Sequence, residues 1–214
     1  MVAGIVSSNA QVYSANVVGY VNVSAPAGQF VLAANPFTTG DDVLSNVVQN
    51  VAGASTVNFW NGSGFTTATY KGGLHQWQLA GNINADNTAV PPGVGFFLNA
   101  SATTNVTFIG SVVANTGGGT ATNVLTGVTV PVGSLIPYVD VVTNTTTINL
   151  QVAGASTLNQ WNVSAQAFQP TFTYKGGLHV WQQPGNVTTN PVIHAAEGFF
   201  LTPAGATNWV ETLQ

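Results

Sequence analysis

Apolar and polar residues alternate in short runs along most of this chain, and Gly, Asn or Pro bounds nearly every run. Three examples are residues 57–70, 93–100 and 105–113, which are rich in Val, Phe, Thr and Tyr. These residue types are enriched in β-strands, where successive side chains point to opposite faces of a sheet. Asn61-Gly62 interrupts the first run, and both residues tolerate the positive φ of a hairpin turn. The pattern predicts an all-β protein of sandwich-like or barrel-like architecture.

Helix signals are sparse by comparison. Only Asp41-Asp42, ahead of the segment VLSNVV, is typical of a helix cap followed by a short helix. We therefore expect one short helix after Asp42, capped by these acids, and strands elsewhere.

Two long stretches of the chain occur twice. VAGASTVNFWN at 51–61 reappears as VAGASTLNQWN at 152–162, and TYKGGLH at 69–75 reappears unchanged at 173–179. The tetrapeptide GFFL follows in both copies, and the spacing between the copies changes by only a few residues. Matching order with a slowly drifting spacing indicates a tandem duplication with changes in loop length. Two copies are too few for a solenoid, so we expect a pseudo-symmetric pair of β units.

The duplication divides the chain into four segments. We expect an N-terminal arm at 1–24, a first repeat at 25–113, a Gly-rich linker at 114–123 and a second repeat at 124–214.

The arm has the pattern of a β-strand without a partner in its own repeat. From Tyr13 onward apolar residues alternate with Ser and Asn. The second repeat has only the polar linker at the equivalent place, and an open sheet edge readily pairs with another chain. We therefore expect the arm to add a strand to a neighbouring subunit, in a head-to-tail contact that propagates as a filament. The candidate contact residues are Val2, Ile5, Tyr13, Ala15, Val17, Val21 and Val23.

Residues 1–10 resemble the last part of a secretory signal. Val2 to Val6 are mostly apolar, and the small residues that follow predict a cleavage site after Ala10. We therefore expect an extracellular or cell-surface location, which also suits a chain with little charge and no cysteine.

Charge is nearly absent from the sequence. Charged residues make up 4% of the 214 residues, the formal net charge is -4, and the only cations besides His are two lysines. Such a surface cannot neutralise phosphates, which excludes nucleic acids and anionic membranes as partners. No apolar run approaches the length that spans a bilayer. With 27 Thr and 22 Asn, the surface is uncharged and rich in hydroxyl and amide groups, which favours self-association.

The repeated heptapeptide contains both lysines and two of the three histidines. Catalysis would require a carboxylate or nucleophile nearby, yet no acid lies within ten residues of His75. The histidines do not have metal-ligand spacing, and no cysteine can complete a zinc site. We therefore expect no enzyme activity, cofactor or metal, and interpret Lys71-Gly72-Gly73 and Lys175-Gly176-Gly177 as exposed structural turns.

The duplicated aromatic residues allow two interpretations. If exposed and coplanar, they would stack on sugar rings; if buried, they are the large core anchors of a β-sheet protein. The second interpretation is favoured because each Trp lies within a strand pattern. The six residues are Trp60, Tyr70, Trp77, Trp161, Tyr174 and Trp181.

The strand motifs themselves resemble a known family. GYVNVSAPAGQFVLAANPF, PPGVGFFLNA and NVTFIGSVV are similar to motifs of exported, largely uncharacterised β-rich repeat proteins of Verrucomicrobia and related bacteria. The resemblance extends from Tyr20 to the end of the chain. It implies a β-rich fold and export, and it implies no activity.

These observations leave two function classes. The first is a structural subunit that self-assembles into an extracellular filament or matrix, with copies of itself as partners. The alternative is a secreted carbohydrate-binding module that uses the duplicated Trp and Tyr residues on glycans.

Overall fold

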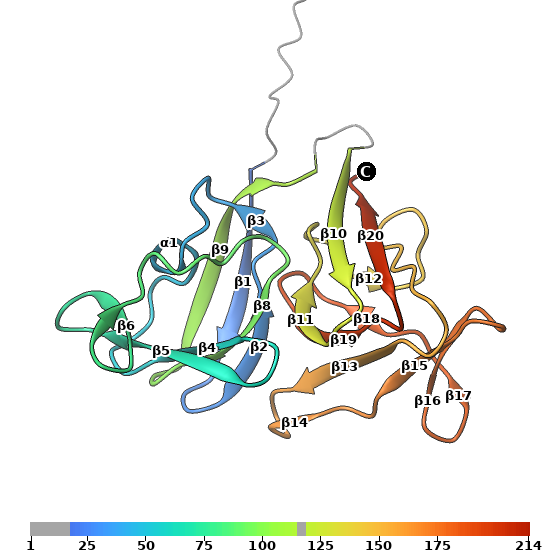
Figure 1. Ribbon diagram of the computed structural model, residues 1–214. Coiled ribbons are helices and arrows are strands. Elements are labelled where there is room, and N and C mark those ends of the chain that lie inside the picture. Colours follow the sequence, from blue (N-terminus) through green and yellow to red (C-terminus); the bar gives the residue numbers. More distant parts are fainter. Residues whose placement is uncertain (1–17, 115–118) are drawn as a thin grey trace, which may run out of the picture.

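The computed structural model describes residues 18–114 and 119–214, and antiparallel strands dominate both parts (Figure 1). We call residues 18–114 the first half and residues 119–214 the second half. The prediction of an all-β protein is confirmed. Five of the candidate subunit contacts lie outside the described residues: Val2, Ile5, Tyr13, Ala15 and Val17.

The first half contains nine strands and one helix. They are β1 (Val18–Ala25), β2 (Phe30–Ala34), β3 (Phe37–Thr38), α1 (Leu44–Val47), β4 (Thr56–Trp60), β5 (Phe65–Lys71), β6 (Gln76–Leu79), β7 (Ile83–Asn84), β8 (Gly95–Asn99) and β9 (Thr104–Val112).

The second half contains eleven strands. They are β10 (Thr120–Thr126), β11 (Val130–Gly133), β12 (Asp140–Val141), β13 (Thr157–Asn162), β14 (Ala167–Phe168), β15 (Phe172–Lys175), β16 (Val180–Gln183), β17 (Val187–Thr188), β18 (Val192–Ile193), β19 (Gly198–Thr202) and β20 (Ala206–Thr212).

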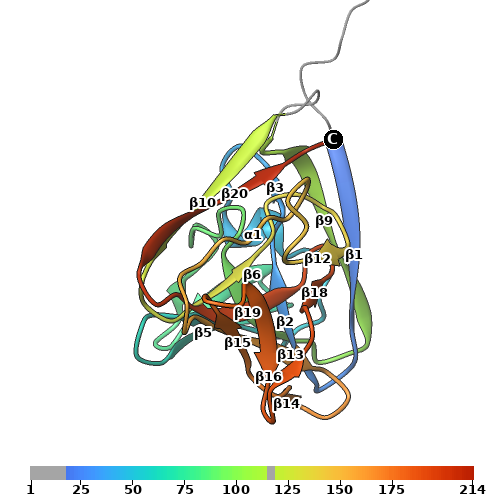
Figure 2. The ribbon, with the colours of Figure 1, turned by 90° about the vertical axis from the view of Figure 1, so that its right-hand side faces the viewer.

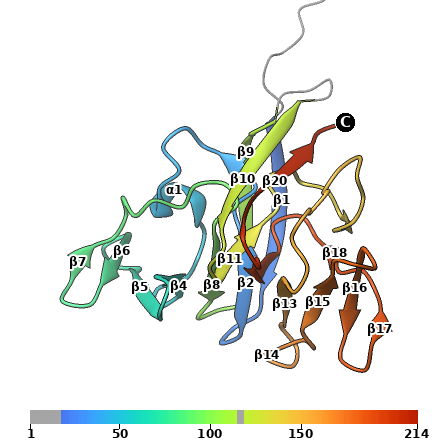
Figure 3. The same ribbon diagram turned by 45° about the vertical axis from the view of Figure 1, so that its right-hand side comes forward.

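The main sheets of the two halves have corresponding strand orders. The order is β2-β8-β4-β5-β6-β7 in the first half and β11-β19-β13-β15-β16-β17 in the second, where β14 also pairs with β13. Duplicated residues occupy equivalent registers, since Val57 pairs with Leu98 and Leu158 pairs with Leu201. The outer hairpins β6–β7 and β16–β17 lie on opposite sides of the molecule (Figure 3).

A second pairing joins the first and last strands of each half. β1 pairs with β9 over their whole length, and β10 pairs with β20 in the same way. The two pairs stand near each other at one end of the molecule, and β14 lies at the other end (Figure 2).

This pairing corrects two expectations about the arm and the linker. Val21 and Val23 lie in β1 opposite Phe108 and Val106, and both pack against the core of their own chain. They are therefore not free to contact a neighbouring subunit. β10 begins at Thr120, inside the predicted linker, so the second half does not lack the strand that the arm was expected to supply. The physical reason is the alternation itself, because Ala121 and Leu125 are buried on one face of β10.

The short helix forms where expected, but the acids do not cap it. α1 begins after Val43, whose position as N-cap carries no side-chain hydrogen bond. Asp42 instead accepts hydrogen bonds from the Thr38 hydroxyl and the Thr39 backbone N–H. Asp42 thus stabilises the turn ahead of the helix, while Asp41 accepts a hydrogen bond from the side chain of Asn46 within α1.

The halves meet through matching backbone contacts. Ala33 forms an isolated bridge with Glu197, and Val132 forms the corresponding bridge with Val94. A Cβ atom on Gly198 would lie 2.8 Å from the carbonyl oxygen of Ala33, too close for any side chain. The glycine of the repeated GFFL motif is therefore required where the two backbones approach each other.

The buried apolar residues form one continuous cluster through both halves. Equivalent aromatic pairs recur in it: Phe96 packs against Phe108 at 6.3 Å between ring centroids, and Phe199 packs against Trp209 at 5.9 Å. The two halves consequently share one core.

Candidate functional site: an aromatic hollow between the two halves

The repeated heptapeptide forms an exposed turn in both halves, as the sequence predicts. Lys71 and Lys175 are exposed at the ends of β5 and β15. A Cβ atom on Gly72 would lie 3.1 Å from the Cα of Gly53, so the turn packs against the loop that carries the other duplicated motif. The positive φ of the turn, 50°, falls on His75. Gly72 is therefore needed for close packing and not for a left-handed conformation.

The histidine of each turn contacts a tyrosine of the same repeated heptapeptide. The Tyr70 hydroxyl lies 3.4 Å from Nδ1 of His75, and Tyr174 and His179 repeat this contact at 3.5 Å. Within residues 18–114 and 119–214, no group of three or more His, Cys, Asp or Glu residues could hold a metal ion.

Four of the six candidate aromatic residues belong to the core or its edge. Trp77 and Trp181 are buried, so neither can stack on a sugar. Tyr70 and Tyr174 are half-buried and pack on these tryptophans, with ring centroids 5.3 Å and 5.4 Å apart. The core interpretation of these residues agrees with the structure.

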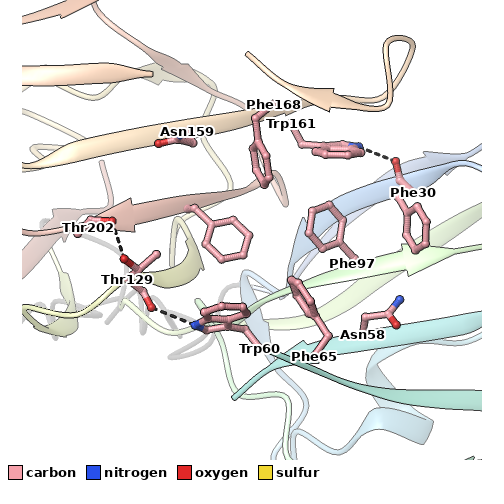
Figure 4. Close-up of a pocket in the computed structure, with 11 residues that line it drawn as sticks. Phe30, Asn58, Trp60, Phe65, Phe97, Thr129, Asn159, Trp161, Phe168 and Thr202 are labelled. Atoms are coloured by element: carbon pink, nitrogen blue, oxygen red, sulfur yellow. Dashed lines mark hydrogen bonds between the residues drawn. The ribbon is translucent and has the colours of Figure 1, made fainter. Parts of the chain in front are cut away.

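Trp60 and Trp161 have a different role, because both line a hollow between the two halves (Figure 4). The hollow has a volume of about 590 Å³. Its remaining lining residues are Phe30, Asn58, Phe65, Phe97, Thr129, Asn159, Phe168, Phe200 and Thr202. Phe30, Phe65 and Phe168 are 39%, 46% and 43% exposed, which is unusual for phenylalanine.

Each tryptophan is anchored on the opposite half. Nε1 of Trp60 donates a hydrogen bond to the backbone oxygen of Thr129 at 3.1 Å, and Nε1 of Trp161 donates to that of Phe30 at 2.8 Å. Phe30, at the start of β2, and Thr129, just before β11, occupy equivalent places in the two halves. Equivalent residues of the two halves thus make reciprocal hydrogen bonds across the hollow, and both halves contribute to its lining.

The aromatic rings meet mostly edge to face. Trp161 lies 5.0 Å from both Phe97 and Phe168, and Trp60 lies 5.1 Å from Phe65 and 5.7 Å from Phe200. Such edge-to-face contacts stabilise the cluster by about 0.5–1.5 kcal/mol per pair beyond burial. The rings hold each other in place and do not form the coplanar platform expected for sugar stacking.

The few polar groups of the hollow are mostly paired within the protein. The hydroxyl groups of Thr129 and Thr202 lie 2.8 Å apart, and Nδ2 of Asn159 donates to the Thr171 hydroxyl at 3.0 Å. Oδ1 of Asn58 accepts a hydrogen bond from Thr67, while its Nδ2 is buried without a partner. None of the lining residues that the structure describes is charged. It offers an incoming molecule apolar surface and few hydrogen bonds.

The five phenylalanines were not singled out from the sequence, although a signal for them exists. In GFFL two successive phenylalanines lie on opposite faces of a strand, so only one of them can enter the core. Phe96 and Phe199 are fully buried, whereas Phe97 and Phe200 face the hollow. The repetition of the second Phe in both copies therefore marks the site.

Two acids of the second half are removed from solvent outside the hollow: Glu211 is buried and Glu197 is half-buried. Burial raises the pKa of Glu211 to about 8, against hydrogen bonds from the Ser134 hydroxyl and the Leu135 backbone N–H that lower it. Burial also raises the pKa of Glu197, which accepts hydrogen bonds from Gln160 and the His194 backbone N–H.

Comparisons with protein-family models, with curated proteins and with solved structures found no significant match. Among the described residues, no helix has the length and apolar character needed to cross a membrane. The fold and site thus define an all-β protein with a neutral, aromatic hollow at the junction of two duplicated halves.

Proposed function

We propose that this protein is a structural subunit that self-assembles into an extracellular filament or matrix, with the aromatic hollow as a contact between copies. The observation that carries this proposal is an apolar hollow whose polar groups are mostly paired internally. Exposed apolar surface of this kind marks interaction sites in soluble proteins. Aromatic side chains in a central pocket are also the residues that contribute most to protein–protein binding.

The nature of the surface supports contact between copies of the chain. The whole protein has a formal net charge of -4 spread over 214 residues, so copies repel one another weakly. An apolar side chain that enters the hollow is removed from water, which stabilises the contact by about 25 cal/mol per Å² of buried apolar area. An extracellular location remains part of the proposal, on the basis of the signal-like segment ahead of Gln11.

A carbohydrate-binding module is the second candidate, and the half-buried pair Trp60 and Trp161 favours it. A sugar that enters a site gives up many hydrogen bonds to water and needs partners in return. Both indole N–H groups are already bonded to backbone oxygens of the opposite half. The hollow therefore suits an apolar occupant better than a glycan.

Sedimentation velocity and negative-stain microscopy of the purified chain test the proposal. We expect the wild type to sediment as polymer and the double variant Phe65→Asn/Phe168→Asn to sediment as folded monomer. Leu74→Asn/Leu178→Asn is the matched control, because these leucines are exposed, occur once in each half and lie outside the hollow. A monomeric wild type whose tryptophan fluorescence shifts with a soluble glycan would reject assembly in favour of the second candidate.

A further inference from the structure

The hollow and the start of β1 lie at opposite ends of the molecule. β1 runs from Val18 to Ala25, and Phe30, which lines the hollow, follows after one turn. Figure 1 shows β1 beginning at the end of the molecule where β10 begins and β20 ends, with β14 of the hollow at the other end. An eight-residue strand spans about 23 Å between its end Cα atoms.

We propose that the hollow of one copy binds the segment Gln11–Val17 of a second copy, with the Tyr13 ring among the aromatic residues. This inference rests on the proposed function and names the occupant of the same site. It replaces strand addition, because β10 already completes the second half.

Chain length favours a contact between copies over one within a copy. Tyr13 precedes Val18 by five residues, and five residues reach at most about 18 Å when fully extended. Even if the chain returned straight along β1, the Tyr13 backbone would stop short of Ala25, the last residue of that strand. Val2 and Ile5 are far enough from Val18 to reach the hollow of their own copy, so they do not share this constraint.

The chemistry of the segment matches the hollow. QVYSANV contains no charged side chain, so its side chains bring no charge to a site whose described lining offers no counter-charge. Tyrosine has a large apolar ring with a polar tip, which suits an apolar site that is open to solvent on one side. Tyr13 also follows Ala10, so signal cleavage at the expected site would leave the segment in place.

The geometry makes the contact directional. In each copy β1, the strand that follows the segment in the chain, begins at one end of the molecule, and the hollow lies at the other, so the two contacting surfaces differ. Such a contact is heterologous, and it propagates as a filament unless the rotation between copies closes a ring.

Three variants of the full chain test the occupant. Tyr13→Ala should weaken association by ten-fold or more, an effect on the order expected for an aromatic anchor. Tyr20→Ala is the matched control, since Tyr20 is 70% exposed on β1 and only seven residues away. Phe65→Asn/Phe168→Asn should weaken association as strongly as Tyr13→Ala. Sedimentation velocity over a concentration series measures all three, with circular dichroism as the check on folding.

The absence of cysteine permits a direct test of proximity. Copies carrying Tyr13→Cys, mixed with copies carrying Phe168→Cys or Phe65→Cys and oxidised, should yield disulfide-linked heterodimers. Copies carrying Tyr20→Cys should not yield them with either partner.

The outcomes separate the two proposals. If the Phe65/Phe168 variant dissociates while Tyr13→Ala and the cysteine pairs show no effect, the occupant is wrong and the proposed function stands. If neither variant dissociates the polymer, the hollow is not the contact and both proposals fall. Loss of association in both variants, with cross-linking from position 13 alone, supports the assignment of Tyr13.

Discussion

In each half a segment follows the first strand of the main sheet, which is β2 in the first half and β11 in the second. The two halves hold this segment in place by different contacts. In the first half that segment includes β3, which pairs with β9 through Phe37 and Val112. In the second half the corresponding segment is held by a side chain, because Glu211 accepts hydrogen bonds from the Ser134 hydroxyl and the Leu135 backbone N–H.

The residue on the last strand explains the difference. A Cβ atom on Gly110 of β9 would clash with the backbone oxygen of Thr38, so only glycine permits β3 to pair there. The corresponding strand of the second half, β20, carries Glu211, which is fully buried. The first half thus holds this segment by backbone pairing between strands, whereas the second half holds it by a buried carboxyl group. Only the carboxyl group can titrate.

The largest expected effect is therefore on pH dependence. Burial raises the folded-state pKa of Glu211 to about 8 from the ordinary value of 4.5, so the folded state binds more protons than the unfolded state between these pH values. Stability is fully present below about pH 4.5 and falls, by about 1 kcal/mol per pH unit, as the pH rises through about 8. Urea unfolding from pH 5 to pH 9 measures this decline.

The variant Glu211→Gln should flatten most of that decline, because a neutral amide keeps the shape of the protonated acid and cannot titrate in this pH range. A smaller decline of the same sign should remain, since burial also raises the pKa of Glu197. An unchanged pH profile in Glu211→Gln would show that the carboxyl group does not distinguish the halves.

The second prediction concerns the first half. Gly110→Ala should destabilise the protein by roughly 2–3 kcal/mol, because the new methyl group meets the Thr38 oxygen and displaces β3. Gly205→Ala is the control, since a Cβ atom there has no neighbour within 4 Å. Equal free energies of unfolding for the two variants would mean that β3 contributes nothing to the first half.

The third prediction tests a feature that the halves share. Gly72→Ala and Gly176→Ala should each lower the free energy of unfolding by about 1 kcal/mol. The new methyl group would lie 3.1 Å from the Cα of Gly53 in the first variant and 3.0 Å from that of Gly154 in the second. Gly73→Ala and Gly177→Ala should change stability by less, since their Cβ atoms would lie in open space. A large difference in thermal stability between Gly72→Ala and Gly176→Ala would contradict the equivalence of the two halves at this turn.

The smallest effect is expected at the lysines. Lys71→Gln/Lys175→Gln should leave the unfolding free energy within about 0.5 kcal/mol of wild type, because both side chains are exposed. The assembly measured by sedimentation should also be unchanged. Loss of assembly in this variant would assign the turns a role in contact between copies.

The outcomes at single residues show what a sequence pattern can predict. Alternation located the strands, and the repeated GFFL indicated that each half has an equivalent central strand. Alternation also implied that the arm was a strand, but it could not say which strand β1 would pair with. Val21 and Val23 pack on their own core because β9 lies beside them, and this neighbour is set by the chain's path through space.

By itself, the sequence determined the strand content, the duplication, the exposed glycine turns and the lack of charge, because each depends on local periodicity, residue type or identity between copies. Only the tertiary structure decided that Trp77 is buried while Trp60 lines a hollow, because both lie in similar strand patterns and differ in what packs against them. The hollow itself exists because Trp60 and Trp161 each bond to the opposite half. A site formed between two units depends on how their backbones meet, and no local pattern encodes that contact.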